Sequence, residues 1–254
     1  MSQVAVYGID VGVYRAGKRG QPLANSSFAW ARVPPRAKPN YGNISSLIDS
    51  MQHDLDSNAR IAVGMEAPMW IPLANSSPDR AAGLQDLSNN VFQDRFRREA
   101  RHRWHLQAGA GAACKAVSLG CFIFSNLGKN ARLRLTTSPY RWRGGHSILC
   151  YEGFAAGAYR ASSSRKGNRR RQDHFNDARA IALAFFYLQP GLRRSALKTK
   201  PETLHECGKR PSAASLWSLI AGVCNLRFEG PADCWVVGAK RGFLTQFPKV
   251  STKL

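Results

Sequence analysis

Three hydrophobic segments that are typical of buried strands each end at a carboxylate. The segments are residues 3–9, 60–65 and 147–151, and the acids are Asp10, Glu66 and Glu152. Parallel strands place their carboxyl ends along one edge of a sheet, where the ligand sites of open α/β folds lie. Carboxylates that meet there repel one another unless protons or a cation compensate their charge. The pattern therefore predicts a group of metal ligands at this edge of the sheet.

The chemistry expected of such a group is phosphodiester hydrolysis. Ligation by oxygen alone suits Mg²⁺ or Mn²⁺, and two such ions about 3.5–4 Å apart clamp the attacking and leaving oxygens. His174 and Asp177 come at the start of the next strong helical pattern, and residues three apart share a helical face. Asp177 is a candidate fourth ligand, and His174 is a candidate to position or deprotonate the attacking water. The candidate catalytic residues are Asp10, Glu66, Glu152, His174 and Asp177.

Each of these residues also has a structural interpretation. Asp173, His174 and Asp177 could cap and complement the N-terminus of a helix. Asp10 precedes a glycine by two residues and could be a turn residue. Glu66 could be a buried acid bonded to the backbone, although burial makes this a costly choice of residue. The combination of the acids at successive strand ends favours the metal site.

The elements that must position these residues alternate between strands and helices. Strands are predicted over residues 3–9, 28–33, 60–65, 147–151 and 234–237, and helices over 43–58, within 92–124, and over 175–188 and 215–226. The first two strands are expected to form a hairpin. In the first helix, Asn43 is the expected N-cap, and Asp49, Asp54 and Asp56 are expected mostly to face water. This order of elements predicts an α/β layered fold.

The charge of the chain predicts a polyanionic partner. Lys and Arg number 37 against 16 Asp and Glu, a formal net charge of +21 over 254 residues that are 44% hydrophobic. This composition indicates a folded protein, with nucleic acid as the expected partner ahead of an anionic membrane.

The arginines fall into three clusters that are expected to contact phosphates. Residues 162–171, which include the last cluster, are expected to form a loop that does not pack. Trp104, Tyr140 and Trp142 lie among the arginines, which suits stacking on unpaired bases, although such aromatic residues can also belong to the core. The candidate nucleic-acid-binding residues are Arg95, Arg97, Arg98, Arg101, Arg103, Arg141, Arg143, Arg165, Lys166, Arg169, Arg170 and Arg171.

Several other classes of protein do not fit the sequence. No stretch approaches the about 18 apolar residues of a membrane span, and no basic segment precedes the first apolar run, so a cytoplasmic protein is expected, nucleoid-associated if bacterial. The six cysteines form no CxxC pair and are expected to be reduced. His102, His105, Cys114 and Cys121 lack a usual zinc spacing. Neither a dinucleotide-binding glycine motif nor a P-loop occurs, and an actin-like ATPase would need a longer chain.

Three short motifs carry a resemblance to a known superfamily. They are Gly8 to Gly12 (GIDVG), Val63 to Glu66 (VGME) and His174 to Ala178 (HFNDA). In this order they resemble the three segments of RuvC-type nucleases in the RNase H-like superfamily. Residues 151–154 (YEGF), followed by a terminal WVV strand, are closer to an uncharacterised family of predicted RNase H-like nucleases. The resemblance spans roughly residues 1–190.

The resemblance implies both a fold and an activity. The fold is an RNase H-like mixed five-stranded sheet in the order 3-2-1-4-5 flanked by helices, with Asp10 and Glu66 on adjacent strands and Asp177 on a helix that crosses above them. Residues 1–190 are expected to form this core, including a basic helical insertion at about 92–143, and residues 191–254 are expected to form a C-terminal helix-strand extension packed on it. RuvC-type enzymes cut DNA with two metal ions.

The sequence therefore predicts a metal-dependent nuclease that hydrolyses DNA or RNA with two Mg²⁺ or Mn²⁺ ions. The alternative is a non-catalytic basic nucleic-acid-binding protein that retains the fold, in which the acids have no role. No membrane partner is expected. RuvC-type resolvases act as dimers, but the sequence does not support a homodimer here.

Overall fold

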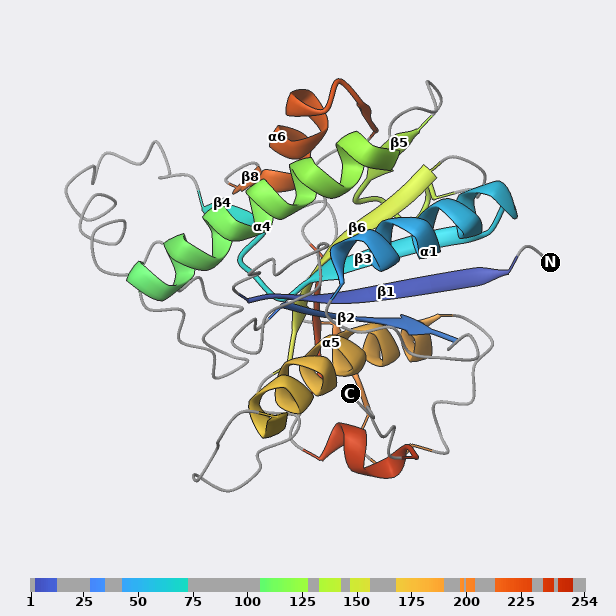
Figure 1. Ribbon diagram of the computed structural model, residues 1–254, viewed down its shortest axis with the longest axis vertical. Coiled ribbons are helices and arrows are strands. Elements are labelled where there is room, and N and C mark those ends of the chain that lie inside the picture. The colour runs from blue at the N-terminus through green and yellow to red at the C-terminus, as the bar shows by residue number, and fades with distance from the viewer. Residues whose placement is uncertain are drawn as a thin grey trace.

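The protein has an α/β architecture in which helices cover both faces of a mixed sheet (Figure 1). The computed structural model describes residues 3–12, 28–34, 43–72, 106–127, 133–142, 147–155, 168–189, 197–198, 200–203, 213–229, 235–239 and 242–248. The layered α/β fold predicted from the alternation of strands and helices is confirmed at this level.

The centre of the sheet is formed by three parallel strands, β1 (Val4–Val11), β3 (Arg60–Met65) and β6 (Ser147–Phe154). β2 (Phe28–Val33) pairs with β1 in the antiparallel sense, as the predicted hairpin requires. The path through the sheet is β2-β1-β3-β6-β10-β7, where β10 is Val236–Gly238 and β7 is Glu202–Thr203. C-terminal residues therefore complete the sheet that the N-terminal residues begin.

Short strands extend this arrangement. β5 (Arg134–Thr136) pairs with the first half of β6, and β9 (Arg227–Glu229) pairs with β5. β4 (Trp70–Pro72) and β8 (Ala213–Ser215) form a separate antiparallel pair that follows the end of β3.

The helices form two layers (Figure 1). One face of the sheet is covered by α1 (Ile44–Asp56), α4 (Leu106–Leu127) and α6 (Leu216–Val223). The other face is covered by α5 (Asn168–Leu188) and the 3-10 helix η3 (Phe243–Gln246). Each layer has its own apolar core, because side chains of successive strand residues point to opposite faces.

Strand register decides which residues face which layer. Ile9, Met65 and Glu152 are direct neighbours across β1, β3 and β6. Ile9 and Met65 belong to the core beneath α1, α4 and α6. The next row, which contains Asp10 and Glu66, therefore faces α5.

α5 packs directly on the backbone of β1 because the contact residue in the strand, Gly8, has no side chain. A Cβ atom on Gly8 would lie 2.0 Å from the carbonyl oxygen of Ala178 in α5. The neighbouring Gly64 leaves room for the ring of Tyr151, which stacks on Phe185 at 4.3 Å between centroids and donates a hydrogen bond to the Ile181 carbonyl. The absence of side chains at these strand positions lets α5 approach within backbone contact of β1.

The N-termini of α5 and α1 differ in how well they match the predictions. The prediction that residues 162–171 form a loop is wrong at its end, since α5 begins at Asn168 rather than near Phe175. Arg and Gln have high helix propensity, so this polar run extends a helix whose later turns are held by packing. α1 has the predicted N-cap, with the Asn43 side chain accepting a hydrogen bond from the Ser45 amide at 2.8 Å.

The prediction that Asp54 faces water is wrong, whereas Asp49 and Asp56 are exposed as expected. Asp54 is fully buried and accepts hydrogen bonds from Arg32 Nε at 2.7 Å and from the Tyr7 hydroxyl at 2.5 Å. Tyr7 and Arg32 are neighbours across β1 and β2, so this network ties α1 to both strands.

Parts of other predictions lie outside the described residues. These are residues 92–105 of the predicted basic helix and residues 35–42, between the second predicted strand and the first predicted helix.

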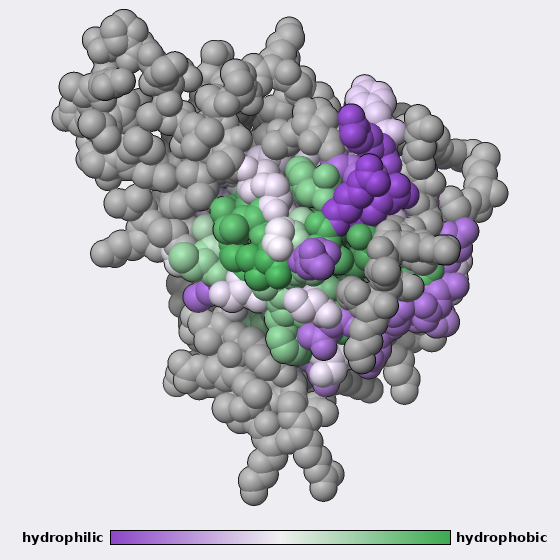
Figure 2. All heavy atoms as spheres, turned by 90° about the horizontal axis from the view of Figure 1, so that it is seen from above, coloured by the Kyte–Doolittle hydropathy of each residue, from purple (hydrophilic) through white to green (hydrophobic). Residues whose placement is uncertain are grey.

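The face seen from above in Figure 2 carries apolar residues near its centre. Among the large apolar side chains in the described ranges, Phe122 on α4 and Leu219 and Val223 on α6 are at least half exposed. No helix in the described part of the chain combines the length and the apolar character needed to cross a membrane.

Candidate metal centre

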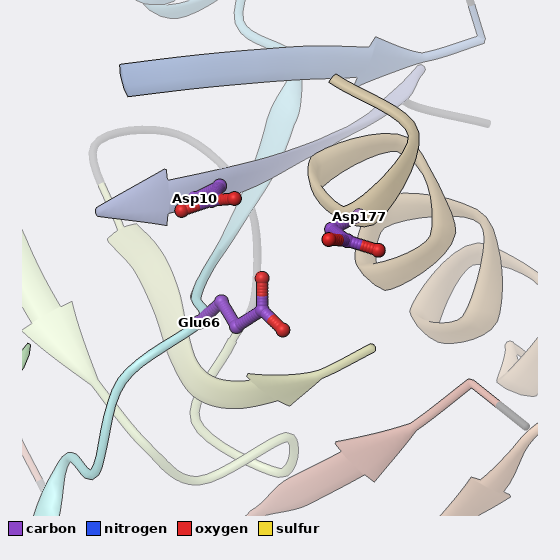
Figure 3. A group of neighbouring side chains, drawn as sticks. All are labelled: Asp10, Glu66 and Asp177. Carbon is purple, nitrogen blue, oxygen red and sulfur yellow. The ribbon is translucent and has the colours of Figure 1, made fainter. Parts of the chain in front are cut away.

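Three carboxylates that are distant in the sequence converge at the carboxyl edge of the sheet. Asp10 lies near the end of β1, Glu66 is the first residue after β3, and Asp177 lies inside α5. One ligand oxygen of each residue lies within 4.8 Å of the others. Figure 3 shows the Asp10, Glu66 and Asp177 side chains pointing toward one shared space between the strands and the helix.

The backbone explains why these three side chains meet. Because β1 and β3 are parallel neighbours, Asp10 and Glu66 leave adjacent strands in the same direction. The Glu66 amide donates a hydrogen bond to the Ile9 carbonyl at 2.8 Å, which extends the ladder by one residue and aligns the two acids. Asp177 reaches them because Ala178, its neighbour in α5, packs directly on Gly8.

The electrostatics of the group favour a bound cation. The pKa of Glu66 is raised well above its ordinary value, first by loss of hydration and then by the negative charges of Asp10 and Asp177. A hydrogen bond from the Ala155 amide to the Glu66 carboxylate opposes this rise. Without a cation, proton uptake is the way to relieve repulsion among the three acids, and a divalent cation would relieve it instead.

His174 contacts the group through Asp10. Its Nδ1 lies 2.5 Å from Asp10 Oδ2, while Asp10 Oδ1 accepts a hydrogen bond from the Gly12 amide at 3.1 Å. An ionised carboxylate only accepts hydrogen bonds, so we infer that Nδ1 carries the hydrogen, which leaves Nε2 as the basic nitrogen of the neutral ring. Asp10 thus makes the turn contact considered from the sequence and also belongs to the acidic group.

The helix-capping interpretation of residues 173–177 does not agree with the structure. α5 begins at Asn168, so Asp173, His174 and Asp177 lie within the helix and not at its N-terminus. Their side chains are therefore not placed to cap the first amides of this helix.

The structure does not bring Glu152 into this group. β6 continues to Phe154, so Glu152 lies inside the strand and in the row of Ile9 and Met65. Its side chain faces away from α5, is fully buried and accepts a hydrogen bond from the Met69 amide at 2.8 Å. The prediction of convergence is wrong for this residue because a shift of one position along a strand moves a side chain to the opposite face.

The predicted nucleic-acid-binding residues are only partly covered by the structure. Arg141 is exposed and follows Tyr140, whose side chain is 79% exposed, on the turn after β5. The backbone of Arg169, Arg170 and Arg171 belongs to the start of α5. Outside the described residues lie Trp104 and the predicted contacts Arg95, Arg97, Arg98, Arg101, Arg103, Arg143, Arg165 and Lys166.

The stacking interpretation of Trp142 is wrong. Its side chain is 2% exposed and packs edge-on against Phe185, with the Arg60 guanidinium 4.2 Å from its ring centroid. Trp142 is therefore a core residue, and its ring is not available to a base.

Two features of the site went unnoticed in the sequence. Gly8 within a buried strand is a recognisable sign that another backbone approaches closely, and this sign was available from the sequence. The Ala155 amide that contacts Glu66 is a backbone group and has no sequence signal.

Comparison with known proteins adds no relative. No family model, curated protein or solved structure matches this chain. Function is therefore inferred from the geometry and charge described above.

Proposed function

We propose that this chain is a metal-dependent nuclease that hydrolyses phosphodiester bonds of DNA or RNA by a two-metal-ion mechanism. The observation that carries the proposal is the convergence of Asp10, Glu66 and Asp177, with one oxygen of each within 4.8 Å of the others. Asp10 and Asp177 are more than half of the chain apart and Glu66 lies between them in the sequence, so local sequence does not account for their meeting.

The arrangement of elements supports an RNase H-like fold as part of this proposal. The resemblance implies that strands 2, 1, 4 and 5 are neighbours in that order, and the sequence pattern predicts that strands 1 and 2 form an antiparallel hairpin. β2, β1, β3 and β6 are neighbours in this order, and β2 is antiparallel to β1. α5 packs across β1 and β2 and carries Asp177, as the resemblance implies for the helix above the sheet.

The donor set fits hard divalent cations such as Mg²⁺ or Mn²⁺. All three candidate ligands are carboxylates, and the pKa of Glu66 is raised first by burial and then by the charges of Asp10 and Asp177, which a divalent cation would offset. Divalent cations held by these residues would activate a water nucleophile and neutralise charge on the phosphate.

His174 has a separate role in the proposal. Its hydrogen bond to Asp10 orients both side chains, and the basic Nε2 is the atom that accepts a proton from the attacking water. The net charge of +21 would bring the nucleic acid to the site, and the exposed Arg141 and Tyr140 offer a phosphate contact and a stacking surface.

The decisive experiment is a cleavage assay on wild type, Asp10→Asn and Asp56→Asn. The substrates are labelled single-stranded DNA, duplex DNA, branched DNA and an RNA–DNA hybrid, each with Mg²⁺, Mn²⁺ or EDTA. Asp56 is an exposed acid on α1, so its variant makes the same change in charge away from the site.

Metal-dependent products that fall at least about 100-fold in Asp10→Asn and persist in Asp56→Asn would support the nuclease, because loss of a ligand should exceed loss of a supporting contact. Salt-sensitive binding without cleavage by any of the three proteins would refute it in favour of a non-catalytic nucleic-acid-binding protein.

A further inference from the structure

The Met69 amide, three residues after Glu66, is buried and needs a hydrogen-bond acceptor outside the regular strand pairing. The regular pairing of β3 ends at Met65, and Pro68 has no N–H to continue it. The next amide belongs to Met69, whose residue is fully buried. A buried amide needs a partner, and Glu152 Oε2 supplies it at 2.8 Å.

The end of β6 holds the segment from Glu66 to Met69 at two points. The Glu152 carboxylate accepts from the Met69 amide, and the Ala155 amide, three residues further along the chain, donates to the Glu66 carboxylate. On its other side, the Met69 carbonyl accepts from the Leu216 amide at 2.9 Å. The short segment between Glu66 and Met69 is thus tied at one end to β6 and at the other end to Ala155, the residue that follows β6.

Glu152 itself is rigidly placed. Its amide donates to the Trp235 carbonyl at 2.7 Å, and its side chain is fully buried in a strand that pairs on both sides. A carboxylate held in this way can act as a fixed anchor for a neighbouring backbone.

We propose that Glu152 is a positioning residue, which anchors the Met69 amide and thereby fixes the Glu66 carboxylate in its place among the metal ligands. This inference rests on the proposed function, because the position of Glu66 matters through the cation that it binds. It assigns to Glu152 a role through hydrogen bonding across the sheet, in place of direct ligation.

The two roles predict different responses to a glutamine substitution. The side chain introduced by Glu152→Gln would keep an oxygen that accepts a hydrogen bond from the Met69 amide. If Glu152 is a positioning residue, Glu152→Gln should therefore keep the position of Glu66, whereas Glu152→Ala should not. A metal ligand would lose its charge in both variants. Glu66→Gln provides the reference for losing a ligand.

The test compares wild type, Glu152→Gln, Glu152→Ala and Glu66→Gln. For each protein we measure Mn²⁺ affinity by titration, hydrogen–deuterium exchange of the Met69 amide, and nucleic-acid cleavage. Tyr7→Phe is the matched control, since it removes a buried hydrogen bond to Asp54 without touching the segment after Glu66. Thermal melting establishes that each variant is folded.

We expect Glu152→Ala to weaken Mn²⁺ binding about 10- to 100-fold, the usual effect of removing a supporting contact, and to speed exchange of the Met69 amide. Glu152→Gln and Tyr7→Phe should stay close to wild type in both measurements, and Glu66→Gln should bind Mn²⁺ more weakly than Glu152→Ala.

Three results would overturn the inference. Glu152→Gln binding Mn²⁺ as weakly as Glu66→Gln would make Glu152 a ligand. Glu152→Ala binding Mn²⁺ like wild type would remove the positioning role. An unchanged exchange rate of the Met69 amide in Glu152→Ala would show that the hydrogen bond to Glu152 does not protect this amide, whether or not the metal binds. If wild-type protein binds no Mn²⁺, the proposed function is overturned instead. The exchange experiment still tests the hydrogen bond between Glu152 and the Met69 amide, because it does not depend on metal binding.

Discussion

Replacing Gly8 by alanine should push α5 away from the sheet and separate Asp177 from the other two carboxylates. The new Cβ atom would lie 2.0 Å from the Ala178 carbonyl oxygen and 2.9 Å from the Ala182 amide nitrogen, whereas ordinary contacts begin near 3.4 Å. Both obstacles are backbone atoms of a helix, so no side chain can rotate out of the way. The helix must therefore move by about 1.4 Å along this contact or the strand must yield by a similar amount.

This displacement sets the expected magnitudes. Forcing one methyl group into a packed interior costs typically about 1–3 kcal/mol, and a rigid backbone obstacle places Gly8→Ala at about 3 kcal/mol. A loss of that size lowers Tm by roughly 6–12 °C for a chain of this length. Metal and catalytic sites tolerate displacements of only about 0.5 Å, so Mn²⁺ affinity and cleavage should fall about 100-fold.

Urea unfolding and Mn²⁺ titration of the same samples test this reasoning. Gly222→Ala is the matched control, because Gly222 lies in α6 and a Cβ there would meet no atom within 4 Å. The control should stabilise the protein by about 0.5–1 kcal/mol through helix propensity and leave Mn²⁺ binding unchanged. A Gly8→Ala variant with wild-type stability and wild-type Mn²⁺ affinity would refute the idea that close approach of α5 builds the site.

Three further outcomes are expected. Asp54→Asn leaves the buried Arg32 guanidinium without its carboxylate and should cost about 3–5 kcal/mol in urea unfolding, whereas the exposed Asp56→Asn should change little; equal effects of the two would contradict the buried ion pair. Because the pKa of Glu66 is raised in the folded protein, the folded state binds more protons than the unfolded state above the ordinary value of 4.5, so in EDTA the stability from this group should fall as pH rises through the raised pKa. Saturating Mn²⁺ should restore it, and Glu66→Gln should flatten the pH dependence of melting. Tyr140→Ala should weaken single-strand binding by about 1–3 kcal/mol in a fluorescence titration without lowering Tm, since the ring is 79% exposed; unchanged affinity would exclude it from the interface.

Many strands and helices were predictable from the sequence, because an element whose residues share one environment has a regular pattern of apolar residues. The continuous apolar run of β3 lies at the predicted residues 60–65, and the predicted helix 43–58 forms as α1, with Leu47, Met51 and Leu55 buried at helical spacing. The start of α5 was misplaced because the polar residues from Asn168 onward contain no periodic signal, although their intrinsic propensity permits a helix.

The sequence by itself determined that Asp10 and Glu66 lie at or just after the ends of buried strands, and the same pattern also selected Glu152. Tertiary structure alone decided that Glu152 faces the opposite core, because that depends on strand register and on the true end of β6. It also decided that Asp54 of α1 is buried, since the Arg32 that neutralises it lies on β2. The chemistry of a side chain follows from its residue type. Its burial and the face of the sheet to which it points depend on partners that only the folded chain brings together.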